Sequence, residues 1–211
     1  MTRVDAMIRR QRDYLRSHRE FVHTRAQAEE SARRLLNAKA GRFAVKDAEA
    51  FLDACNTERL VRHPSIFDMS DGPRLTRFGP AFVRRNRQQM LSDLSTFNRW
   101  LLRLWEAPAG QIDSALDQFW MAREIKGASR GLPTMIAYLR DPDANMVWLP
   151  YLTKGVIFLE KENLSLAPRL RHYSAYRSLV NRAVRARYQL KPQELDYVLF
   201  CTAGMANDEE P

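Results

Sequence analysis

The residues best suited to bind a ligand stand in a short connection between two predicted helices, at residues 126–134. Two glycines there, Gly127 and Gly131, permit positive φ angles and close backbone approach. The next helix, predicted to begin at Pro133, offers free N–H groups and the positive end of its dipole. Side-chain donors come from Lys126, Ser129, Arg130 and Thr134. The combination predicts a phosphate site; the alternative is an ordinary helix–helix turn, which often contains glycine.

Arginine dominates the positive charge of the chain. The 211 residues contain 34 Lys and Arg against 25 Asp and Glu, a net charge of +9. Residues 74–103 contain seven arginines and one acid, and residues 169–191 contain six arginines, one lysine and no acid. Such segregated charge predicts a polyanionic partner, the alternative being a general arginine-rich composition. From these segments we expect phosphate contacts by Arg84, Arg85, Arg87, Arg182, Arg185 and Arg187.

Other residue types give weaker signals. The chain contains no GxxxxGK and no HExxH, and its histidines lack metal-ligand spacing. Asp113 and Asp117 are four residues apart on a predicted helix and could bind Mg²⁺, but a solvated helix face is the preferred interpretation. We expect no enzymatic activity, no metal and no cofactor. Three tryptophans fit helix packing, whereas Trp148, between turn signals, is left open between core and ligand contact.

The first 40 residues contain neither glycine nor proline and end at Gly41. Ile8, Leu15 and Val22 recur every seven residues, which predicts one long amphipathic helix. Such a helix would be roughly 60 Å long, so it must protrude, break or pack against a partner. We expect it to be dispensable for the folding of the remainder but needed for assembly with a protein partner.

The rest of the chain shows helical periodicity and no useful run of alternating polarity, so the fold class is all-α. Residues 57–79 are expected to be irregular, because prolines and glycines interrupt them. The domain division is a helix over 1–41, a helical domain over 42–203 and an acidic tail over 204–211. Helices are predicted over residues 43–56, 80–90, 92–106, 111–125, 133–140, 150–160, 172–188 and 192–201, with Ser92 as an N-cap.

Composition restricts the class of protein. Hydrophobic residues make up 45% and charged residues 28%, which are ordinary globular values. No apolar run approaches the ~20 residues of a membrane span, and the N-terminus has no apolar signal region. The two cysteines are far apart, which indicates a reducing, cytoplasmic location and no disulfide framework.

The region of residues 111–200 resembles the helix–hairpin–helix modules of DNA repair proteins and glycosylases. It departs from them because Gly127 and Gly131 are spaced G-x-x-x-G instead of G-x-G. The lysine and the more distant aspartate that such glycosylases use are not both present, since residues 145–150 read Asn-Met-Val-Trp-Leu-Pro. The departure argues against glycosylase chemistry.

A broader resemblance covers residues 40–203. In order along the chain, the strings at residues 97–100, 119–120, 126–128, 133–142 and 194–200 are similar to the helical region preceding the motor of McrB-type restriction AAA+ GTPases. The chain has no Walker motifs, so the motor is absent. The resemblance implies a DNA-recognition or adaptor module of a prokaryotic restriction or antiviral defence system.

Three functional hypotheses follow. The leading one is a non-enzymatic nucleic-acid-binding module, with DNA expected rather than RNA and no membrane partner. The second is a protein-interaction adaptor that docks through residues 1–40. The third is a diverged helix–hairpin–helix glycosylase.

Overall fold

The computed structural model describes residues 3–17, 19–56, 86–128, 130–149, 153, 155–158 and 172–208. Over these residues every regular element is a helix and no strand occurs, which confirms the all-α class. The elements are α1 (Arg3–Ser17), α2 (Arg19–Lys39), α3 (Val45–Cys55), α4 (Arg87–Leu91), α5 (Leu94–Glu106), the 3₁₀ turn η2 (Ala109–Gln111), α6 (Ile112–Ala122), α7 (Gly131–Arg140), α9 (Tyr173–Val180), the π-helical segment η3 (Asn181–Ala186) and α10 (Pro192–Asp208).

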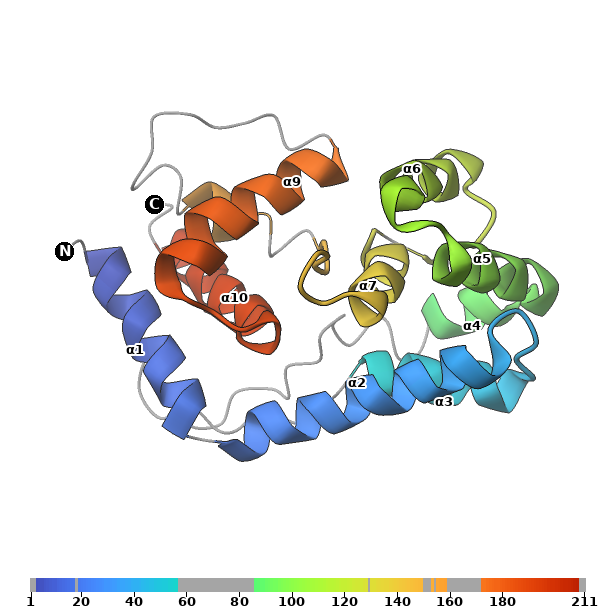
Figure 1. Ribbon diagram of the computed structural model, residues 1–211, viewed down its shortest axis with the longest axis horizontal. Helices are drawn as coiled ribbons and strands as arrows, with labels where there is room; N and C mark the ends of the chain where they lie inside the picture. Colours follow the sequence, from blue (N-terminus) through green and yellow to red (C-terminus); the bar gives the residue numbers. More distant parts are fainter. Residues whose placement is uncertain are drawn as a thin grey trace.

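The first 40 residues form two helices instead of one straight rod. Figure 1 shows α1 beside α10, while α2 turns away and runs along the base of the molecule against α3. Residue 18, between the two helices, lies outside the described residues. The expected outcomes for a helix of this length were protrusion, a break, or packing against a partner. The change of direction corresponds to a break.

The apolar stripe of α1 and α2 is covered by other helices of the same chain. Ile8, Leu15, Ala32 and Leu36 are buried and belong to the same core cluster as residues of α5, α7 and α10. This burial argues against the expectation that the first 40 residues are dispensable for folding, since their removal would expose this core to water.

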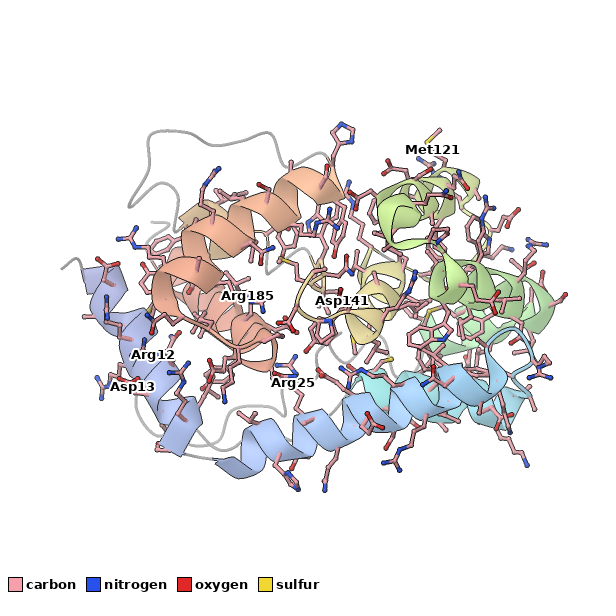
Figure 2. All side chains as sticks on the ribbon, in the orientation of Figure 1. Arg12, Asp13, Arg25, Met121, Asp141 and Arg185 are labelled. Carbon is pink, nitrogen blue, oxygen red and sulfur yellow. The ribbon has the colours of Figure 1, made fainter. Side chains whose placement is uncertain are left out.

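Charged side chains join α2 to α10 and α7 inside the molecule. The guanidinium of Arg25 donates to Asp196 Oδ2 at 2.6 Å, and Figure 2 shows Arg25 between α2 and α10. Glu29 is fully buried, lies 3.7 Å from both Arg25 and Arg33, and accepts a hydrogen bond from the Tyr138 hydroxyl at 3.1 Å. Glu29 stands seven residues after Val22, where the repeat of Ile8, Leu15 and Val22 predicts an apolar residue. A glutamate fits there because it faces this polar cluster and not solvent.

Two further contacts hold α1 against the C-terminal helices. Arg16 donates to Glu194 at 2.9 Å, which raises the pKa of Arg16. Asp5 accepts from the Tyr188 hydroxyl at 2.6 Å and from Arg187 at 2.9 Å. Arg16 and Arg187 therefore both have carboxylate partners within the chain.

Several predicted helix boundaries shift. Asp93, and not Ser92, caps α5, because its carboxylate accepts from the backbone N–H of Thr96 at 2.9 Å. α6 ends at Ala122 and α7 begins at Gly131, two residues before Pro133. The helix predicted over 172–188 contains the π-helical segment η3, and α10 continues to Asp208, into the predicted tail. The predicted irregular segment 57–79 and the start of the 80–90 helix lie outside the described residues.

Among the described helices, none has the length and apolarity required to cross a bilayer.

We expect Arg25→Ala to lower the free energy of unfolding by about 3 to 5 kcal/mol, because it leaves the buried carboxylate of Asp196 without its ion-pair partner. Urea denaturation followed by circular dichroism would measure the change. The matched control is Arg34→Ala on the same helix, which removes an exposed ion pair with Glu30 and should change stability by about 1 kcal/mol or less. Equal stability of the two variants would contradict a structural role for the buried cluster.

Candidate nucleic-acid interface

The connection between α6 and α7 is tightly structured. Arg123 ends α6 in the left-handed conformation at φ +52°, and Ile125 is buried in the core. Gly127 follows at φ +77°, a conformation that favours glycine. The backbone N–H of Ala128 donates to the carbonyl of Ile125 at 3.3 Å, which closes the turn.

The close backbone approach expected at Gly127 takes place inside the protein. A Cβ at this position would lie 3.0 Å from the Asn86 carbonyl oxygen and 3.0 Å from Gln89 Oε1, beside α4. Gly127 therefore lets the connection pack against α4 and does not leave its Cα face open to a phosphate.

Thr134 and Gly131 have structural roles. Both are buried, and the Thr134 hydroxyl donates to the Arg130 carbonyl at 2.8 Å and accepts from the Trp148 backbone N–H at 2.9 Å. Thr134 therefore has no free donor for a phosphate. Because Gly131 is buried, a bulky substitution there would disturb packing and would not report on phosphate binding. Ser129 lies outside the described residues.

Three exposed cations remain on the connection: Arg123, Lys126 and Arg130. Within the described part of the chain none of them makes an ion pair. Lys126 and Arg130 were expected from the sequence. Arg123 was not, because the predicted helix continued past it to residue 125.

The acidic residue of the connection is occupied elsewhere. Glu124 accepts from the Trp100 indole N–H at 2.6 Å and from Arg99 at 2.7 Å, so it binds the connection to α5. The indole N–H, and then Arg99, stabilise the carboxylate and lower the pKa of Glu124. Its charge is directed toward α5 and does not neutralise the three cations.

An aromatic stack lies behind the connection. The Arg130 guanidinium lies 4.1 Å from the centroid of the Trp148 ring, and Trp148 stacks on Tyr176 with centroids 5.3 Å apart and planes inclined by 15°. Trp148 is 1% exposed, which resolves its open interpretation in favour of the core. The core interpretation of Trp100, Trp105 and Trp120 is also confirmed, since each is buried or packs against the core.

Of the four described helical arginines predicted to bind phosphate, three are paired with carboxylates. Arg87 pairs with Asp53, and Arg187 pairs with Asp5 at 2.9 Å. Arg185 pairs with Asp143, in the turn that follows α7; Figure 2 shows Arg185 on the side of the C-terminal helices that faces this turn. Arg182 is exposed and makes no ion pair with any described residue, while Arg84 and Arg85 lie outside the described residues.

Residues 127–131 also read G-x-S-x-G, the pattern of hydrolase nucleophile elbows. That elbow joins a strand to a helix, whereas here helix α6 precedes the match and the described residues contain no strand. The required structural context is therefore not met.

Two other features of the described residues bear on possible chemistry: the Asp113 carboxylate, considered for Mg²⁺, and a surface hollow. Asp113 pairs with Arg177 at 3.0 Å, and no group of three or more metal-ligating residues occurs among the described residues. A shallow hollow of about 300 Å³ lies between α5 and α6. Its lining contains neither lysine nor aspartate, so it does not supply the pair that a glycosylase of the helix–hairpin–helix type would need. The lining residues are Arg103, Glu106, Ala107, Pro108, Gln111, Ser114, Ala115 and Gln118.

Comparison with family models, with curated proteins and with solved structures finds no match to this chain. The geometry of the α6–α7 connection is therefore the basis for assigning a function.

We expect the anchoring of the connection by Glu124 to weaken at acidic pH. Because the pKa of Glu124 is lowered in the folded protein, its stabilising contribution is present above the ordinary glutamate range and is lost as the pH falls through the folded-state pKa. Unfolding curves recorded between about pH 6 and pH 3 should show a smaller acid-induced loss of stability for Glu124→Gln than for the wild type.

The control for this experiment is Glu49→Gln, at an exposed position that makes no ion pair with any described residue. It should retain the pH dependence of the wild type. An unchanged pH dependence in Glu124→Gln would show that the contacts with Trp100 and Arg99 do not stabilise the connection.

Proposed function

We propose that the chain is a non-enzymatic module that binds duplex DNA through its phosphates, using the α6–α7 connection. The observation that carries the proposal is the group of exposed cations, Arg123, Lys126 and Arg130, which have no carboxylate partner among the described residues. In contrast, Arg87, Arg185 and Arg187, which belong to the two basic segments, have such partners.

Unpaired cations on one short connection produce a local positive potential that paired arginines do not. A phosphate would also meet the positive end of the α7 dipole, since α7 begins at Gly131. Arg182 is a further exposed cation, and it makes no ion pair with any described residue. Contacts of this kind position a protein on a duplex without reading sequence.

The pairing observed in the structure reduces the expected number of phosphate contacts. With Arg87, Arg185 and Arg187 paired to carboxylates, about three or four contacts remain, so log affinity should fall with log salt with a slope of roughly −3. That slope is smaller than the net charge of the chain alone would suggest.

The biological setting that we propose, a prokaryotic restriction or defence system, rests on the resemblance to the region preceding McrB-type motors. The adaptor hypothesis is less favoured, because the apolar stripe of α1 and α2 that would bind a partner is buried within the chain. Diverged glycosylase chemistry is the least favoured, because the hollow between α5 and α6 lacks the required residues.

We expect Arg123→Ala and Lys126→Ala each to weaken binding to a duplex oligonucleotide and to reduce the salt slope by about 0.9, because each removes one phosphate contact. Both side chains are exposed, so thermal stability should not change. Fluorescence anisotropy at several salt concentrations, with duplexes of unrelated sequence, would measure affinity and slope together. RNA of the same sequence provides the comparison with DNA.

Lys46→Ala is the matched control, since Lys46 is exposed and lies on α3, at the opposite edge of Figure 1 from α6. It removes the same charge and should leave the slope unchanged. Undetectable wild-type binding at low salt would overturn the proposal and show that the arginine surplus is compositional. An equal loss in all three variants would show that net charge, and not the connection, determines binding.

A further inference from the structure

Four arginines of the described chain have a guanidinium over an aromatic ring: Arg103 over Trp100 at 4.9 Å, Arg130 over Trp148 at 4.1 Å, Arg177 over Tyr173 at 5.5 Å and Arg187 over Tyr188 at 5.4 Å. Three of them also donate to a protein acceptor. Arg103 donates to Gln118, Arg177 to Asp113 and Arg187 to Asp5. Arg130 donates to no acceptor among the described residues, although it makes the closest ring contact of the four.

The ring beneath Arg130 is firmly held. The Trp148 indole N–H donates to the Thr153 hydroxyl at 2.9 Å, and its backbone N–H donates to the Thr134 hydroxyl at 2.9 Å. Trp148 also stacks on Tyr176, whose hydroxyl donates to the Val147 carbonyl at 3.2 Å. Both rings are buried, so the plane on which the guanidinium rests has little freedom to move.

A guanidinium that rests over a rigid ring is restricted in position, and its N–H groups form a planar fork that remains available to a ligand. This is the arrangement that binds a phosphate through two parallel hydrogen bonds, which a lysine ammonium cannot reproduce. Because the stacking already orders the side chain, less conformational freedom is lost when a ligand binds.

We propose that Arg130 binds one phosphate group in a bidentate manner and that Trp148 and Tyr176 are positioning residues for its guanidinium. The inference rests on the proposed function, since the phosphate is taken to be a phosphodiester of duplex DNA. It specifies the chemistry of one contact: the Arg130 guanidinium donates two parallel hydrogen bonds to the phosphate, whereas the Lys126 ammonium acts as a point charge.

The first test separates the fork from the charge. Arg130→Lys keeps the charge and should lower duplex affinity roughly tenfold without changing the salt slope, whereas Arg130→Ala should lower both. The reciprocal control, Lys126→Arg, should bind at least as well as the wild type, because no ring orients that side chain. Wild-type affinity in Arg130→Lys would overturn the inference.

The second test addresses the positioning residues with a double-mutant cycle. If Trp148 acts by orienting Arg130, the Arg130→Lys substitution should cost much less affinity in a Trp148→Phe background than in the wild type. Circular dichroism would verify that Trp148→Phe remains folded. Trp148→Leu serves as the second variant, because it removes the ring under the guanidinium and keeps an apolar side chain in the core. The same Arg130→Lys loss in every folded background would overturn the positioning role.

A phosphate titration distinguishes failure of this inference from failure of the proposed function. Inorganic phosphate bound at Arg130 should change tryptophan emission in the wild type but not in Arg130→Lys. That result without any duplex binding would support the fork and overturn the proposed function. Duplex binding that is equally tight in the wild type and in Arg130→Lys would support the proposed function and overturn bidentate binding by Arg130.

Discussion

The ion pair between Arg25 and Asp196 determines how the chain closes. Its two residues are 171 positions apart, and both are almost fully buried. A buried charge without a partner is strongly unfavourable, so α2 and α10 can pack well only in a register that brings these groups together. Glu29, between Arg25 and Arg33 and bonded to Tyr138, extends the same requirement to α7. The arrangement of three helices distant in sequence therefore follows from one polar cluster in an apolar core.

Placement of α7 in turn places the candidate interface. Arg33 donates to the Leu139 carbonyl at 2.7 Å, so the end of α7 is held to α2, while Thr134 ties its first turn to Trp148. The connection before α7 is bound on its other side by Glu124. Rigidity at Arg130 is thus a consequence of contacts that begin in the core, and the cations next to it extend from a well-held backbone.

The sequence predicted the helical elements well, because each depends on apolar spacing within some ten to fifteen residues. It could not predict which arginines were available, because their partners are remote: Arg187 pairs with Asp5, 182 residues away, and Arg185 with Asp143, 42 residues away. The change of direction between α1 and α2 was undecided for the same reason. Trp148 was left open because burial is a property of the assembled core. Thr134 was assigned as a free donor because its helix was predicted to begin at Pro133, whereas α7 begins at Gly131 and its hydroxyl donates to the carbonyls of Arg130 and Gly131 in the same turn.

Segregated charge in a sequence therefore has two physical meanings, and the structure separates them. Where an arginine lies against an acid from another part of the chain, as Arg185 lies against Asp143, it stabilises the fold and contributes little to the outer field. Where the nearby acid is occupied, as Glu124 is by Trp100 and Arg99, the neighbouring cations keep their electrostatic effect. Arg123, Lys126 and Arg130 are of the second kind, even though the helical clusters are richer in arginine. We therefore expect ligand binding at the α6–α7 connection, although it contains fewer basic residues than the helical clusters. The number of unpaired cations, and not the total number of cations, determines how much positive charge faces a ligand.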